Sequence, residues 1–207
     1  MSSLAVLGAS GHGKVLADCA GLIGWNDVIF FDDVWPRLEM NGAWPVAGDT
    51  AGLLKTLSDF DGVLVAIGNN RIRQQKLALL QQAGAAVVSL VHPAAVVSRY
   101  ASIGSGSVVF AGAVINVDAV VGAGSIINTG ARVDHDCVLG EAVHISSGAS
   151  LAGGVRVGDR AWVGIGAAVR QLVSVGPDAT IGAGAVVVKD VAADMTMVGN
   201  PARVLVR

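Results

Sequence analysis

Charged and aromatic side chains are scarce in this chain of 207 residues, of which 14% are charged and only 4% are Phe, Trp or Tyr. An average protein has about 25% charged residues. The formal net charge is −2, and the lysines and arginines are scattered singly. A nucleic-acid-binding protein needs a basic patch to displace counterions from the phosphates. We therefore expect no nucleic-acid partner.

Long apolar runs are also missing, and we expect no secretory leader. The chain is 53% apolar, but Gly, Asp, Asn or Ser interrupts every apolar stretch before it reaches the roughly 18 residues that a spanning helix requires. No basic segment precedes an apolar run at the N-terminus. The sequence therefore predicts a cytoplasmic protein without membrane insertion. High hydrophobicity with little net charge also excludes a disordered chain.

Cysteine is limited to Cys19 and Cys137. Their spacing does not match a zinc site, and two distant cysteines in a cytoplasmic protein are more typical of small buried side chains than of a disulfide. The sequence therefore predicts no metal site.

A period of six residues dominates the second half of the chain. Sixteen consecutive positions at this spacing are aliphatic, namely Val97, Ile103, Val109, Ile115, Val121, Ile127, Val133, Leu139, Ile145, Leu151, Val157, Val163, Val169, Val175, Ile181 and Val187. The residue two positions earlier is always small or Val. Neither a helix nor an ordinary strand has this period, whereas a parallel β-helix of hexapeptides does, with three hexads in each triangular coil. Residues 92–207 are therefore predicted to form about five coils.

Glycine often follows the aliphatic residue of the hexad, as at Gly104, Gly122 and Gly140. We expect these glycines to supply corner conformations that other residues adopt only with strain. Periodicity alone leaves open a purely structural solenoid without chemistry.

Residues 1–91 lack the six-residue period and alternate strand and helix signals, which predicts a small Rossmann-like α/β domain with a parallel sheet. The strands are expected at 4–7, 28–31, 63–67 and 87–91. Helices are expected after the loop at 8–14, ending near Cys19, and from about Ile72 to Gln82.

The first loop is rich in glycine and lies between the first strand and the first helix. It resembles a nucleotide-triphosphate loop, but Val15 stands where a Ser or Thr would bind magnesium, and it lacks the dinucleotide fingerprint. Glycines still let the backbone approach a ligand, and the helix N-terminus attracts an anion. We therefore expect Gly8, Ser10, Gly11 and His12 to bind a diphosphate-linked substrate.

Two further loops are expected at the same edge of the sheet. Asp32 and Asp33 follow the second strand, and Gly68 and Asn69 follow the third. Ligands of open α/β sheets bind at the carboxyl ends of the strands. A solvated turn is the alternative for each segment alone, but three converging loops predict a nucleotide-type pocket.

Four segments together resemble the bacterial UDP-4-amino-sugar N-acetyltransferases of the bacillosamine pathway, which serve protein glycosylation. They are GASGHG at 8–13, IFFDD at 29–33, AIGNN at 66–70 with Arg73, and DHDCVLGE at 134–141. Sialic acid O-acetyltransferases and perosamine N-acetyltransferases are similar relatives. The resemblance extends over essentially the whole chain.

The resemblance implies a left-handed β-helix, a homotrimer and acetyl-CoA bound between neighbouring subunits. It places the general base on His135 and the acid beside it on Asp136, where the bacillosamine enzymes carry Glu. It places His144 near the acetyl group, reaching His135 only across a subunit interface. It further implies an oxyanion contact at Gly153 and a CoA contact at Pro201. Asn128, and His12 from the first loop, are implied to contact the sugar.

The sequence thus predicts an N-acetyltransferase that acts on a UDP-linked 4-amino-4,6-dideoxy sugar by direct attack, with acetyl-CoA as co-substrate and no metal. O-acetylation of sialic acid and N-acetylation of a GDP- or dTDP-linked amino sugar are the alternatives in the same class. A nucleotide-sugar-binding scaffold without activity is the alternative in another class.

Overall fold

The computed structural model describes residues 2–206 and contains two compact units. Unit 1 extends to Pro93, and unit 2 begins at Ala94. None of the helices within the described residues is long and apolar enough to cross a membrane.

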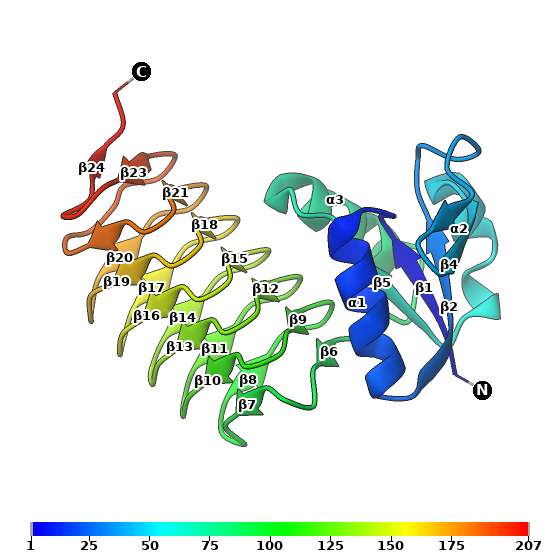
Figure 1. The fold of residues 1–207 in the computed structure, drawn as a ribbon, viewed down its shortest axis with the longest axis horizontal. Coiled ribbons are helices and arrows are strands. Elements are labelled where there is room, and N and C mark those ends of the chain that lie inside the picture. Colours follow the sequence, from blue (N-terminus) through cyan, green and yellow to red (C-terminus); the bar gives the residue numbers. More distant parts are fainter. Residues whose placement is uncertain (1, 207) are drawn as a thin grey trace. The chain divides into compact units, whose positions relative to one another are not determined.

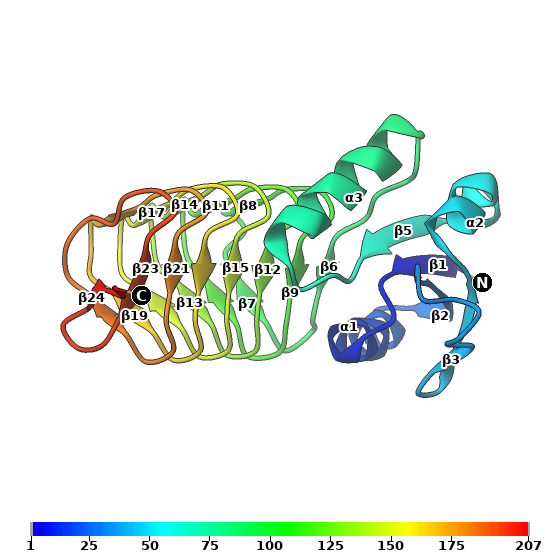
Figure 2. The ribbon, with the colours of Figure 1, turned by 90° about the horizontal axis from the view of Figure 1, so that it is seen from above.

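Unit 1 is an α/β domain built on a five-stranded sheet with the order β3-β4-β2-β1-β5; Figure 1 labels β1, β2, β4 and β5, and Figure 2 labels β3. Its elements are β1 (Ser2–Leu7), α1 (Gly11–Leu22), β2 (Trp25–Phe31), β3 (Met40–Asn41), β4 (Trp44–Gly48), α2 (Thr50–Lys55), a 3₁₀ turn (Leu57–Asp59), β5 (Gly62–Val65), α3 (Asn70–Gln82) and β6 (Leu90–Val91). Strands β4, β2, β1 and β5 are parallel, and β3 is antiparallel to β4. Residues 4–7 of the central strand β1 are at most 2% exposed, which explains why this strand is continuously apolar.

The parallel sheet of unit 1 confirms the predicted fold class, with differences in its elements. The sequence did not indicate β3, β4 or α2. Strand β4 carries Pro45, which weakens a strand signal, and β3 and α2 are too short to show a period. In the segment predicted as a fourth strand, Val87 forms a single bridge with Val63, and only Leu90–Val91 is a strand. Helix α1 begins at Gly11, inside the predicted loop.

Unit 2 is a left-handed parallel β-helix, as predicted. Its short strands recur at the hexad spacing, and most of them pair in parallel with the third strand after them, one coil further along the chain. Figures 1 and 2 show the resulting coils stacked side by side from green to red. The strands are β7 (Val96–Val97), β8 (Ser102–Ile103), β9 (Val108–Val109), β10 (Val114–Ile115), β11 (Val120–Val121), β12 (Ile126–Ile127), β13 (Arg132–Val133), β14 (Val138–Leu139), β15 (His144–Ile145), β16 (Ser150–Leu151), β17 (Arg156–Val157), β18 (Trp162–Val163), β19 (Ala168–Val169), β20 (Ser174–Val175), β21 (Thr180–Ile181), β22 (Val186–Val187), β23 (Thr196–Val198) and β24 (Arg203–Val204).

Three flat faces result from this stacking. The first contains β7, β10, β13, β16, β19 and β22, and the second contains β8, β11, β14, β17 and β20. The third runs from β9 through β12, β15, β18 and β21 to β23 and β24, of which β24 alone is antiparallel to its neighbour. The aliphatic column lines the interior, where every member from Val109 to Val187 is at most 3% exposed.

The glycines that follow the aliphatic residues have a different role from the one that we expected. None of them has a positive φ. A Cβ on Gly122 would lie 2.3 Å from the carbonyl oxygen of Gly140 on the next coil, so these glycines permit close stacking of the backbone. Left-handed conformations occur two residues later, at Gly124 and, without glycine, at Asp136 (φ 59°).

The two kinds of glycine lead to different expected costs of substitution. Gly122→Ala forces coils apart, and we expect it to lower the free energy of unfolding by about 2–3 kcal/mol, as overpacking does. Gly166→Ala has open space around its Cβ and a φ of +65°, so we expect only the strain of the left-handed conformation, about 1 kcal/mol. Urea unfolding of both variants tests the order, and equal losses would contradict the stacking role of Gly122.

Candidate active site

The three predicted loops of unit 1 meet at the carboxyl ends of its parallel strands. A Cβ on Gly8, after β1, would lie 2.8 Å from the carbonyl oxygen of Ala66, after β5. The N–H of Ala9 donates to the Asp32 carboxylate, after β2, at 2.7 Å. Since β2 and β5 flank β1 on opposite sides, this edge is where the strand order reverses, the usual ligand position in such sheets.

Asp32 and Asp33 are held by contacts within unit 1. The second oxygen of Asp32 accepts from the N–H of Val34 at 3.0 Å, so this carboxylate fixes the loops. Asp33 forms an ion pair with Lys76 at 2.8 Å and accepts from the N–H of Thr50. The hydrogen bond from Lys76 is the main cause that lowers the pKa of Asp33 to about 2.

Arg73 supports the third loop from below. Its guanidinium is buried and donates to the carbonyl oxygens of Ile67 and Gly68 at 2.9 and 3.1 Å and to Asn70 Oδ1 at 2.8 Å. Burial lowers its pKa to about 10, so it stays charged. Asn69 caps α3 by accepting from the N–H of Ile72 at 3.0 Å. Gly68 and Asn69 therefore stabilise the start of α3 and its loop, in addition to their predicted role in binding.

The first loop presents the N-terminus of α1. Ser10 is exposed and makes no capping hydrogen bond with its side chain, and Gly11 has open space where a Cβ would stand. Burial, and then the charge of Arg73, lower the pKa of His12 to about 4. At neutral pH His12 is therefore an uncharged imidazole, which can hydrogen-bond a sugar but adds no charge for a phosphate.

In unit 2, His135 and Asp136 form a dyad at the corner between β13 and β14. His135 Nδ1 lies 2.7 Å from Asp136 Oδ2, and both side chains are more than half exposed. The hydrogen bond to Asp136 and the charge of Asp134 raise the pKa of His135. Because Nδ1 is engaged, Nε2 remains as the atom that can exchange a proton with a substrate.

Two residues that the site prediction omitted orient this corner. Asp134 Oδ1 accepts from the backbone N–H of His135 at 2.8 Å and from Asn116 Nδ2 at 2.9 Å. These hydrogen bonds lower the pKa of Asp134. Asn116 stands one full coil before Asp134, so the repeat length was the signal that would have paired them.

Gly153 lies directly against the imidazole. A Cβ at this position would be 2.5 Å from His135 Cε1 and 2.6 Å from Nε2. Gly153 is buried, and its N–H makes no hydrogen bond within residues 2–206. A free backbone donor beside a base is the arrangement that stabilises an oxyanion.

A cleft of about 590 Å³ opens at this corner. It is lined by His135, Asp136, Gly153, Gly154, Arg156, Gln171, Leu172 and Ser174. The dyad thus faces a space large enough for part of a substrate.

His144 is placed on β15, on another face of the coil. Its ring is buried and stacks on Trp162 at 5.1 Å between centroids. Asn128 Nδ2 lies 3.2 Å from His144 Nε2, while Asn128 Oδ1 accepts from the N–H of Thr129. The amide therefore donates to Nε2 and places the proton of the neutral ring on Nδ1. The structure brings Asn128 and His144 together and keeps both apart from His135.

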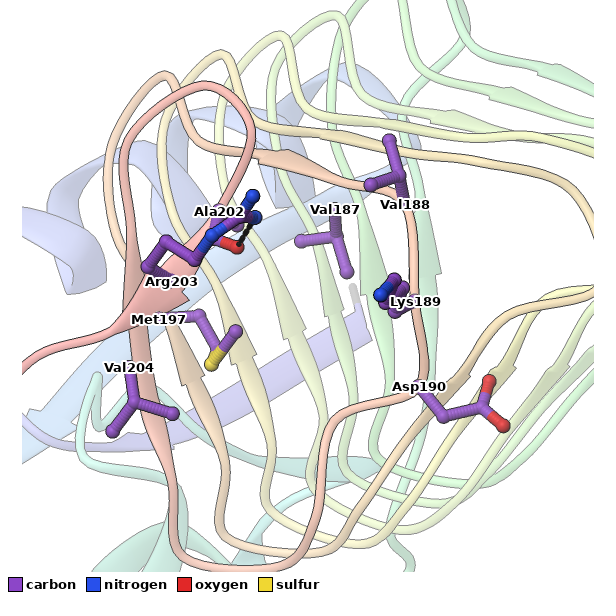
Figure 3. Close-up of a pocket in the computed structure, with 8 residues that line it drawn as sticks. All are labelled: Val187, Val188, Lys189, Asp190, Met197, Ala202, Arg203 and Val204. Atoms are coloured by element: carbon purple, nitrogen blue, oxygen red, sulfur yellow. Dashed lines mark hydrogen bonds between the residues drawn. The ribbon is translucent and has the colours of Figure 1, made fainter.

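A smaller pocket of about 280 Å³ occurs at the end of the β-helix, next to the predicted CoA contact Pro201. Lys189 and Arg203 lie on opposite sides of it, with Met197 among the lining residues (Figure 3). Gly153, Gln171 and Lys189 follow one another at the spacing of one coil, so they occupy the same corner on successive coils. One corner of the coils thus connects the dyad with a pair of cations.

Metal ligands do not gather in this structure. Within residues 2–206 there is no group of three or more His, Cys, Asp and Glu side chains that would hold an ion. Cys19 and Cys137 are both buried and free.

A family model and a curated relative each match part of the chain. Residues 3–80 match the PglD N-terminal domain family. Over 111 residues, 53% of this chain and 51% of the relative, the sequence is 36% identical to UDP-N-acetylbacillosamine N-acetyltransferase of Bacillus subtilis. The chain therefore aligns with about half the length of that curated relative.

Solved structures match over nearly the whole chain. The acetyltransferase domain of PglB from Neisseria gonorrhoeae, in complex with acetyl coenzyme A, is 46% identical, with 98% of each chain covered and a TM-score of 0.94. A histidine-to-asparagine variant of perosamine N-acetyltransferase from Caulobacter crescentus, in complex with CoA and GDP-perosamine, is 37% identical. The alignment covers 100% of this chain and 98% of the perosamine enzyme, with a TM-score of 0.95.

Proposed function

Because the chain belongs to the family of bacterial amino-sugar N-acetyltransferases with a PglD N-terminal domain, we propose that it transfers the acetyl group of acetyl-CoA to a nucleotide-linked amino sugar. The acceptor is the 4-amino group of a UDP-linked 4-amino-4,6-dideoxy sugar. The observation that carries the proposal is the His135–Asp136 dyad beside the free N–H of Gly153.

The reaction is a direct attack. The amine nitrogen bonds to the thioester carbonyl carbon while His135 Nε2 accepts the proton of the amine, which typically contributes about 10²–10⁴-fold to the rate. The Gly153 N–H donates to the oxyanion. When the C–S bond breaks, the thiolate of CoA leaves and takes the proton from His135. Asp136 orients the ring and stabilises its charged form.

The charges at the end of the β-helix support acetyl-CoA as donor. Lys189 and Arg203 flank the terminal pocket and complement the phosphates of CoA. The corner through Gln171 offers the pantetheine a path toward His135 and Gly153. Pro201, in a cis peptide bond after Asn200, precedes Ala202 and Arg203 of this pocket in the sequence.

The loops of unit 1 support a nucleotide sugar as acceptor. Gly8, Ser10 and Gly11 present the positive end of α1 to a diphosphate. Asp32, Asp33, Gly68 and Asn69 border the same edge, and neutral His12 can hydrogen-bond to a sugar.

We further propose a homotrimer in which His144 and Asn128 of one subunit approach His135 of another. The two histidines lie on different parts of one coil, so a single chain does not unite them. Sedimentation that shows a stable monomer with full activity would contradict this assembly.

A GDP-linked acceptor is the second candidate, because the perosamine enzyme, solved with GDP-perosamine, matches the whole chain. A panel of UDP-, GDP- and dTDP-linked amino sugars, with thiol release from acetyl-CoA as readout, tests both. The proposal requires the UDP-linked 4-amino sugar to give the highest kcat/KM. If no acceptor in the panel causes thiol release, a nucleotide-sugar-binding scaffold without activity would be favoured.

The dyad gives the reaction a defined pH dependence. Only neutral His135 accepts a proton, so kcat/KM falls as pH drops through its pKa, which lies above the usual value of about 6.5. Asp136→Asn removes the main cause of the raised pKa, and we expect the acidic limb of the profile to move to lower pH while the maximal rate falls. Asp118→Asn is the matched control, since Asp118 has the same φ of 59° one coil earlier. A limb that does not move in Asp136→Asn would contradict the role of the dyad.

A further inference from the structure

Leu172 has an unusual combination of conformation and exposure. Its φ is +61°, in the left-handed region that branched and bulky side chains avoid. Its apolar side chain is 78% exposed. The other non-glycine residues with a positive φ in residues 2–206 are Asp, Arg or a buried Ala. Both features disfavour leucine at this position, and such strained residues are often found at functional sites.

The position of Leu172 is defined by the stacking of coils above the dyad. Asp136, Gly154 and Leu172 occupy the same corner on three successive coils, and the N–H of Leu172 donates to the Gly153 carbonyl oxygen at 3.0 Å. Between the dyad and Leu172, the coil therefore presents only Gly153 and Gly154. We call this gap the Gly153–Gly154 notch.

The Leu172 side chain bends down into this gap. Its Cδ2 lies 2.7 Å from the point where a Cβ on Gly154 would stand. The isobutyl group thus bounds the notch on the side opposite His135, within the same cleft.

The substituents of the thioester carbonyl carbon can be assigned to this space. The oxygen faces the Gly153 N–H, and the sulfur with its long pantetheine chain needs the open corner toward Lys189. The acyl methyl is left with the part of the notch beside Gly154 that Leu172 bounds. A longer acyl chain would meet Leu172 there.

We propose that Leu172 determines acyl-donor specificity by limiting the notch to an acetyl group and excluding longer acyl chains. This inference rests on the proposed function and concerns the same site. Packing of Leu172 against a second copy of the chain is the competing role.

The test compares acetyl-, propionyl- and butyryl-CoA as donors for the intact protein and for Leu172→Ala. Because one methylene in a closely fitting pocket changes selectivity by about 10–200-fold, we expect the ratio of kcat/KM for propionyl-CoA to that for acetyl-CoA to rise at least about 10-fold. Ile165→Ala is the matched control, since Ile165 is a 60% exposed apolar residue outside the cleft. We expect its ratio to equal that of the intact protein.

An unchanged ratio in Leu172→Ala would overturn the inference. Sedimentation distinguishes the competing role, because loss of the assembly with an unchanged ratio would assign Leu172 to packing. Failure of the intact protein to transfer any acyl group would instead overturn the proposed function.

Discussion

Replacing His135 by alanine is expected to lower kcat/KM for acetyl transfer by about 10²–10⁴-fold, the usual contribution of a positioned general base. Among residues 2–206 of one subunit, His135 is the only histidine that lines the cleft. The side chain is more than half exposed, so the fold loses little, and we expect an unchanged urea midpoint. Steady-state kinetics with the acceptor that the panel identifies supply the measurement.

His92→Ala is the control, because His92 does not line the dyad cleft. We expect this variant to keep the activity of the intact protein. His135→Asn retains a polar side chain of similar size without a base and should lose as much activity as His135→Ala. Activity of either His135 variant close to that of the intact protein would exclude His135 as the base.

Replacing Gly153 by alanine is expected to lower kcat by about 100-fold with little change in KM. The new methyl would overlap the imidazole, with Cε1 at 2.5 Å, and His135 must rotate away from Asp136 and from the amine. A misplacement of about 1 Å at a reacting group costs an enzyme about 10²-fold. The backbone N–H remains in this variant, so the loss reports on the position of the ring.

Gly166→Ala again provides the control, since its Cβ meets open space and the residue lies outside the dyad cleft. Measured stabilities separate the two causes of a loss. A Gly153→Ala protein that is as active as the intact one would show that the ring does not need this contact. A protein that unfolds would show that Gly153 serves stacking of the coils.

The six-residue period was sufficient to predict the β-helix, because the stacking of each coil on the next repeats the same demand for an interior aliphatic residue. It was not sufficient to explain the glycines. The backbone of Gly140 approaches Gly122 from the next coil, and a reading of single hexads contains no such contact. The sequence therefore predicted corner conformations for these glycines, whereas in the structure they permit close stacking between coils.

Two parts of the candidate site were predictable: the dyad, whose residues are adjacent in the sequence, and the three loops of unit 1, each of which follows a predicted strand. His135 and Asp136 form one motif, and the structure adds their 2.7 Å contact. Asn116 and Leu172 lie at the same corner on other coils. The buried Arg73 holds the loop after β5 through hydrogen bonds to two of its carbonyl oxygens. The roles of these three residues depend on exposure and packing that no local motif records.

Strand β24 changes the edge that the β-helix presents at the end of its third face. A stack of parallel coils ends in a row of unpaired N–H and C=O groups, which invites another stack to add to it. Here Arg203–Val204 folds back antiparallel on β23, with Met197 facing Val204. The new edge is short and carries an arginine, two of the features by which sheet proteins avoid edge-to-edge aggregation. On this face of the β-helix, the short edge with its arginine therefore disfavours the addition of a second stack along the axis on which the fold repeats.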